Sequence, residues 1–418
     1  MAKIGPDLPR FHAMMATVAS FGGTERGGLH RLAASPEDKL ARDWLVAFMK
    51  ENGFRVFIDA VGNICGVLEF AGPDAPLVMT GSHLDSQPYG GRFDGAYGVV
   101  AACEGALALK DAVASGALRA TRNLGVVSWT NEEGARFQPS LIGSFFYTGR
   151  TTAESVHALR DGDGISLGHA LGAIGYIGTD TLPRAASYVE LHIECGPELE
   201  KAGRSIGVFT GWWGAIKTRV SILGEQAHTG PTAMAHRKDA LYGASLLIAA
   251  IRGLADKTNA GGVERLYTSV GKLEVEPNSP NVVPGRATLY IELRSADPAV
   301  LTEAESVLGK LIEGVSATSK LEAVIENVSL REAGQFDAGL VRLTEAAAAS
   351  AGHEAMHLLT IAAHDAVPLA PHIPSVVVAV PSVGGICHHE DEFTKPEDLE
   401  AGLIVLTDML VRLCEGGR

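Results

Sequence analysis

The chain is organised around the stretch PLVMTGSHLDSQPYGGRFDGAYG, residues 76–98. Its apolar start, residues 77–80, predicts a buried strand, and the residues from Asp94 onward predict a helix. His83 and Asp85 stand where the strand ends, and a glycine-rich turn separates them from Asp94. Because sites in open α/β sheets form beyond the carboxyl ends of the strands, these three side chains predict a functional site at that edge.

Three further predicted strands end close to ionisable side chains. The strands span residues 123–129, 187–193 and 375–380, and the side chains are Glu132, Glu133, His192 and His388. Groups at the ends of neighbouring strands converge without any loop of unusual length. The sequence therefore predicts that these side chains meet those of the first stretch.

Length and composition limit the class of protein. With 418 residues, of which 46% are hydrophobic, we expect a globular protein of two domains. A formal net charge of −14 argues against binding to nucleic acid or to acidic membrane surfaces. No apolar run is long enough to span a bilayer, and the start of the chain lacks the pattern of a signal peptide. Five scattered cysteines without a Cys-x-x-Cys pair favour a reducing cytoplasm.

The order of predicted strands and helices changes between residues 217 and 328. There the predicted order is β-α-β-β-α-β, which is typical of a ferredoxin-like unit. We therefore expect an α+β domain at residues 212–329, inserted into a catalytic α/β domain that is formed by residues 1–211 and 330–418.

A helix predicted over residues 37–52 shows the local signals clearly. Ser35 is expected to cap its first turn, and Pro36 suits its first position. The apolar side chains expected on its buried face are Leu40, Trp44, Leu45, Phe48 and Met49.

Nitrogen and oxygen donors make up the candidate ligand set. Its members are His83, Asp94, Glu132, Glu133, His192 and His388. Without a thiolate pattern, this set suits two borderline divalent ions such as Zn²⁺, Mn²⁺ or Co²⁺. Paired ions need a bridging carboxylate, a role that suits Asp94. Asp85 is expected to accept the second ring proton of His83, and one of the two adjacent glutamates to bind metal while the other acts as a base. Each residue alone also fits an ordinary structural role, so the hypothesis depends on their shared position at strand ends.

At these residues the chain resembles the hydantoinase/carbamoylase group of amidohydrolases, within the aminoacylase and carboxypeptidase superfamily of dinuclear zinc hydrolases. The motifs run in the family's order over nearly the whole chain. They are GSHLD (81–85), GRFDG (91–95), TNEEGARF (130–137), ELHIE (190–194), GEQAHTG (224–230), PNVVPG (280–285), ELR (292–294), HDA (364–366) and the turn at His388. Each motif is weak alone, and the ordered series is specific.

The resemblance implies a three-layer catalytic domain with a mixed sheet, two divalent metal ions and a role for each site residue. Zinc is the first expectation for the metal, with manganese, cobalt or nickel as alternatives. The implied metal ligands are His83 and His192 for one ion, Glu133 and His388 for the other, and Asp94 between them. Glu132 would be the general base, and His228, on the inserted domain, would stabilise the oxyanion. Asn281 and Arg294 would hold the α-carboxylate of the substrate.

The resemblance also implies the reaction. We expect a hydrolase of carbon–nitrogen bonds other than peptide bonds, which cleaves the carbamoyl (ureido) or a related amide bond of small N-substituted amino acids through a metal-bridged hydroxide. The inserted domain would act as a lid and as the interface of a homodimer. An aminoacylase or dipeptidase with the same metals, and a catalytically silent binding protein on the same scaffold, are the alternatives.

Two cysteines depart from the family pattern. Cys195 stands where the family usually has a glutamine that contacts the ureido or amide end of the substrate, and Cys387 stands where serine is usual. We expect Cys195 to contact the substrate, in a pocket that differs from that of the common carbamoylases. Cys195 as a nucleophile is a weaker alternative, because a metal-activated hydroxide already fills that role.

Overall fold

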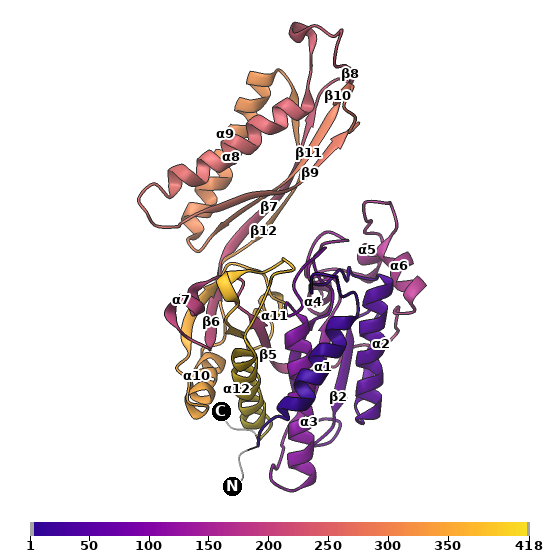
Figure 1. Cartoon of the computed structure of the whole chain (residues 1–418), viewed down its shortest axis with the longest axis vertical. Helices are drawn as coiled ribbons and strands as arrows, with labels where there is room; N and C mark the ends of the chain where they lie inside the picture. Colours follow the sequence, from indigo (N-terminus) through magenta and orange to yellow (C-terminus); the bar gives the residue numbers. More distant parts are fainter. Residues whose placement is uncertain (1–3, 416–418) are drawn as a thin grey trace. The chain divides into compact units, whose positions relative to one another are not determined.

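The computed structural model describes residues 4–415 and divides into two compact units, each with its own hydrophobic core (Figure 1). Unit 1 comprises the chain before Gly211, residues 335–358 and the chain after Ile361. Unit 2 comprises Gly211–Gly334 together with Leu359–Ile361.

A mixed sheet forms the centre of unit 1. In spatial order its strands are β1 (Arg55–Ile58), β2 (Ile64–Leu68), β4 (Asn123–Trp129), β3 (Leu77–His83), β5 (Ala185–Ile193), β15 (Ser375–Val380), β6 (Gly207–Trp212) and β13 (Gly334–Gln335), and β14 (Met356–Thr360) pairs with β6. The four strands β4, β3, β5 and β15 are parallel neighbours, while β1, β2 and β6 pair antiparallel. The carboxyl ends of four consecutive strands therefore lie at one edge.

Helices cover both faces of this sheet, as side chains along β5 show. Leu191 faces the layer of α3 (Ala96–Ala114) and α12 (Pro396–Glu415), which pack together: a Cβ added at Gly402 of α12 would lie 3.2 Å from Leu191 Cδ1. The side chain of the preceding residue, Glu190, points to the opposite face of the sheet. There its Oε2 accepts from the backbone N–H of Ala366 in α11 (Ala366–Leu369) at 2.9 Å. The predicted three-layer α/β fold is thus confirmed. All residues of β3, β4 and β15 are buried, as expected for strands covered on both faces.

The remaining helices of unit 1 complete these layers. They are α1 (Leu8–Ser20), α2 (Pro36–Glu51), α4 (Ile142–Tyr147), α5 (Ala153–His157), α6 (Leu167–Ile174), α7 (Glu198–Ala202), α10 (Ala338–Ser350) and the 3-10 turn η2 (Val383–Gly385). Among the helices within residues 4–415, none is long and apolar enough to cross a membrane.

Unit 2 has the predicted β-α-β-β-α-β order. Its elements are β7 (Gly214–Leu223), α8 (Ala240–Thr258), β9 (Tyr267–Glu276), β11 (Arg286–Ser295), α9 (Pro298–Ser319) and β12 (Glu322–Arg331). The antiparallel sheet has the order β12-β7-β11-β9, and both helices pack on one of its faces (Figure 1). The connections between these elements carry three short segments. β8 (Ala227–His228) and the 3-10 turn η1 (Met234–His236) lie between β7 and α8, and β10 (Val282–Val283), which pairs with β8, lies between β9 and β11. The ferredoxin-like prediction is confirmed.

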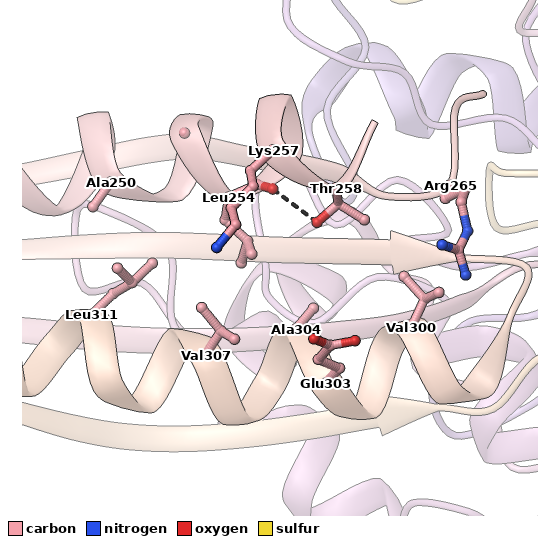
Figure 2. A pocket seen from close by; sticks show the side chains of 11 residues that line it. Ala250, Leu254, Lys257, Thr258, Arg265, Val300, Glu303, Ala304, Val307 and Leu311 are labelled. Carbon is pink, nitrogen blue, oxygen red and sulfur yellow. Dashed lines mark hydrogen bonds between the residues drawn. The ribbon is translucent and has the colours of Figure 1, made fainter. Parts of the chain in front are cut away.

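A pocket of about 450 Å³ lies between α8 and α9 of unit 2 (Figure 2). Its lining combines aliphatic side chains such as Leu254 and Val307 with the charged Lys257, Arg265 and Glu303. It contains none of the site residues predicted from the sequence.

Helix α2 confirms the predicted cap and corrects the predicted face. The Ser35 side chain accepts from the Asp38 N–H, and Pro36 is the first helical residue. Leu45 and Met49 are fully buried, but Leu40 is 51% exposed. The prediction was wrong at Leu40 because the buried residues follow the spacing 38, 41, 42, 45 and 49, and position 40 lies about 160° from the centre of that line, on nearly the opposite side of the helix.

Replacing Leu45 by alanine should lower the free energy of unfolding by about 2–5 kcal/mol, because it removes a fully buried side chain and leaves a cavity. Leu40→Ala, on the same helix, is the matched control and should change the free energy by less than about 0.5 kcal/mol. Urea denaturation followed by circular dichroism measures both. Equal losses for the two variants would contradict the assigned face of α2.

Candidate metal centre

The candidate ligands lie beyond the carboxyl ends of the parallel strands. His83 is the last residue of β3, and His192 is the penultimate residue of β5. Asp94 stands just before α3, Glu132 and Glu133 follow β4, and His388 follows β15 in a turn. Since these strands are neighbours in the sheet, all of these side chains meet at one edge.

Asp94 joins two groups of ligands. Its Oδ1 lies 3.1 Å from His192 Nε2 and 3.6 Å from His83 Nε2. Its Oδ2 lies 3.2 Å from His388 Nε2, which is in turn 3.3 Å from Glu133 Oε2. Ligand atoms of each group lie within 4.8 Å of one another. Imidazole and carboxylate donors at this spacing fit borderline divalent cations.

Backbone carbonyls fix the ring orientation of the two buried histidines. His83 Nδ1 lies 2.9 Å from the Asp85 carbonyl oxygen, and His192 Nδ1 lies 2.9 Å from that of Ile193. A carbonyl only accepts, so Nδ1 carries a proton in each ring and Nε2 of the neutral ring presents its lone pair towards Asp94. The prediction for Asp85 was wrong in detail, because its carbonyl, rather than its carboxylate at 3.9 Å, meets the ring.

The electric field at this edge favours positive charge. Burial alone would lower the pKa of His83 and of His192, but the neighbouring carboxylates, Glu132 and Asp94 for His83 and Asp94 for His192, outweigh it and raise both pKa values well above their usual range. Burial would also lower the pKa of His388. The carboxylates of Asp94 and Glu133 outweigh this effect and raise that pKa to about 12. A field that strongly stabilises imidazolium also stabilises a bound cation.

Glu132 and Glu133 are adjacent in sequence but differ in their surroundings. The Asp85 carboxylate accepts from the N–H groups of both residues, at 3.2 and 3.3 Å, and so fixes the turn. Gln87 donates to Glu133 through its backbone N–H (3.1 Å) and its Nε2 (2.9 Å). Glu132 Oε2 instead lies 3.6 Å from His83 Nε2. Burial and the charges of Asp365, Glu133 and Asp94 exceed the attraction of His83 and raise the pKa of Glu132 well above its usual value.

Sequence reasoning missed several residues that support the ligands. Besides Gln87, Glu392 Oε1 accepts from the N–H groups of Phe93 and Asp94, at 2.9 and 3.1 Å, and so holds the segment that carries Asp94. Gly95 has a φ of 66°, and a Cβ there would be 2.3 Å from the His83 ring. A glycine is required at this position because it combines a left-handed conformation with close approach.

Three of the predicted site residues belong to unit 2. His228 is exposed on β8, and its Nδ1 accepts from the Gly230 N–H at 3.0 Å. Asn281 is also exposed, and its carbonyl accepts from Thr229, next to His228. Arg294 is half-buried and donates to Glu292 Oε2 at 2.7 Å and to the Ile361 carbonyl at 2.9 Å. Its guanidinium is therefore already oriented by a carboxylate of the same strand.

Cys195 and Cys387 lie together beside Asp94. Their Sγ atoms are 2.7 Å apart, and Cys387 Sγ donates to Asp94 Oδ2 at 3.1 Å. Thiols therefore occupy the immediate surroundings of the carboxylate that joins the two ligand groups.

Known proteins resemble this chain over most of its length. The model of peptidase family M20/M25/M40 matches residues 79–412. A hydrolase of Mycolicibacterium smegmatis is 40% identical over 96% of this chain and 92% of its own length. The N-carbamoyl-L-amino acid amidohydrolase of Geobacillus stearothermophilus is 32% identical over 97% of this chain and 98% of its own.

The solved structures point to the same group. The crystal structure of an amidase of the hydantoinase/carbamoylase family from Burkholderia vietnamiensis superimposes with a TM-score of 0.92, at 36% identity and with 99% of both chains covered. From its motifs, its fold and these similarities, the chain belongs to peptidase family M20/M25/M40 and, within it, to the hydantoinase/carbamoylase group of amidases.

Proposed function

We propose that this protein is a divalent-metal-dependent amidohydrolase that cleaves the carbamoyl (ureido), or a related amide, carbon–nitrogen bond of N-substituted amino acids. The observation that carries the proposal is the position of Asp94 between two ligand groups, with the buried carboxyl group of Glu132 alongside. The activity named for the Geobacillus stearothermophilus relative, which spans nearly the whole chain, supports this substrate class.

The proposed cofactor is a pair of divalent ions, zinc first, with manganese, cobalt or nickel as alternatives. His83 and His192 would hold one ion, Glu133 and His388 the other, and Asp94 would be a ligand of both. When bound, such ions polarise a carbonyl oxygen and lower the pKa of a water molecule so that it attacks at neutral pH.

Glu132 moves the proton in the proposed mechanism. Its raised pKa suits a base that accepts a proton from the attacking water and later donates it to the leaving nitrogen. The carbon–nitrogen bond breaks as that nitrogen takes the proton. With a carbamoyl substrate, the products would be the amino acid, ammonia and carbon dioxide.

Unit 2 supplies the remaining polar contacts in this proposal. In the neutral ring of His228, the bond from Gly230 to Nδ1 leaves the proton on Nε2, which suits donation to a developing oxyanion. Arg294 and Asn281 would bind the α-carboxylate, since a guanidinium forms charge-assisted bonds to carboxylates. Cys195 would contact the ureido or amide end of the substrate. The proposal also includes closure of unit 2 as a lid and a cytoplasmic location.

A homodimer through unit 2 completes the proposal. Edge strand β12 exposes Ile325, Val328 and Leu330, each by about half of its surface. Unpaired edges and clustered exposed apolar residues are typical of association surfaces.

A substrate panel tests the proposed function. Purified protein supplied with Zn²⁺ or Mn²⁺ should hydrolyse N-carbamoyl-L-amino acids with a higher kcat/KM than the N-acetyl derivatives or dipeptides of the same amino acids. It should release ammonia and amino acid in equal amounts. The carboxamide of the best substrate, which lacks the α-carboxylate, should lose about 10- to 100-fold in kcat/KM, the value of a charged hydrogen bond. Faster turnover of acyl substrates or dipeptides would instead identify an aminoacylase or dipeptidase.

Glu132→Gln should lower kcat by about 10²- to 10⁴-fold, because it removes the general base without changing the shape of the side chain. Elemental analysis should find its metal content unchanged. The adjacent Glu133→Gln is the matched comparison and should lose bound metal, because Glu133 belongs to a ligand group. A Glu132→Gln enzyme with more than a tenth of normal activity would contradict the assigned role.

A further inference from the structure

The five cysteines fall into two classes. Cys65, Cys103 and Cys414 are buried in the core, whereas Cys195 is exposed and Cys387 is half-buried. Cys195 follows β5 and Cys387 follows β15, and these strands are parallel neighbours. Residues 192 positions apart in the chain are therefore brought together by the sheet, on the side that solvent reaches.

The distance between the two sulfur atoms can be compared with that in a disulfide bond and with that of two thiolates bound to one metal ion. At 2.7 Å, they need to approach by a fraction of an ångström to reach the length of a disulfide bond, about 2.05 Å. Two thiolates that share a tetrahedral zinc ion at about 2.3 Å each would lie about 3.8 Å apart. The observed distance is closer to the covalent bond than to joint ligation of one ion.

We propose that Cys195 and Cys387 are an oxidation site that forms a reversible disulfide by exchange with a small-molecule disulfide. The Cys195 sulfur attacks the small molecule, forms a mixed disulfide and releases one thiol. The Cys387 sulfur then attacks the Cys195 sulfur, forms the internal disulfide and releases the second thiol. Two protons pass from the cysteines to the two released thiols, so the protein is oxidised by two electrons and the small disulfide is reduced by two.

The disulfide would change the surroundings of Asp94. It removes the thiol hydrogen that Cys387 donates to Asp94 Oδ2. It also ties the turn that carries His388 to the segment that follows His192, and these histidines approach different oxygens of Asp94. Oxidation would therefore fix two segments that meet at the same carboxylate.

Thiol counting tests this site on the full chain. Protein freed of reductant is incubated with excess oxidised glutathione, with and without EDTA, then denatured and alkylated, and its intact mass is measured. Alkylated thiols should fall from five to three in both samples, without retained glutathione. Peptide mapping should find a Cys195–Cys387 crosslink, and dithiothreitol should restore all five thiols.

Two variants separate this site from general oxidation. Cys387→Ser should retain one glutathione on Cys195, because no second thiol is there to release it. Cys414→Ala, which removes a buried cysteine, should still lose two thiols. Five remaining thiols in the wild type, or a mixed disulfide that persists on its Cys195, would overturn the proposal. Loss of thiols only in the presence of EDTA would also overturn it, because it would mean that a cation holds the sulfurs.

Discussion

A buried carboxylate that is shared by three imidazoles is the interaction on which the site depends. Asp94 is only 5% exposed, and burial of a lone charge is costly unless it is paired and hydrogen-bonded. Here Nε2 atoms of His83 and His192 approach one oxygen, that of His388 approaches the other, and Glu392 holds the backbone N–H. Because each oxygen has its own partners, the carboxylate separates the donors into two groups. The proposed pair of cations would take one group each.

The sheet makes this arrangement possible. Four parallel neighbours bring their carboxyl ends to one edge, and each contributes or precedes a ligand. The turn after β4 then places two chemically identical residues, Glu132 and Glu133, in different surroundings. Asp85 fixes the backbone of both, and Gln87 holds the Glu133 carboxylate while Glu132 stays near His83. One glutamate can therefore serve as a ligand and its neighbour as a base.

Long elements and strand-end ligands could be predicted from the sequence, because they have a period or a motif. The parallel strands, the β-α-β-β-α-β order and the cap of α2 are of this kind. Other features leave no such signal. Helices such as α5 and α11 are five and four residues long, too short to show a period. Leu40 lies nearly opposite the buried residues of α2. Gln87 and Glu392 are single polar residues whose roles appear only when the fold brings them to their partners. The pairing of Cys195 with Cys387 likewise depends on the adjacency of β5 and β15.

Anomalous diffraction from crystals grown with zinc tests the proposal that Asp94 lies between two cation positions. Two anomalous peaks are expected, about 3.5–4 Å apart. One should lie beside Oδ1 with His83 and His192, and the other beside Oδ2 with Glu133 and His388. A single peak at full zinc occupancy, or two peaks that do not share the Asp94 carboxylate, would contradict it.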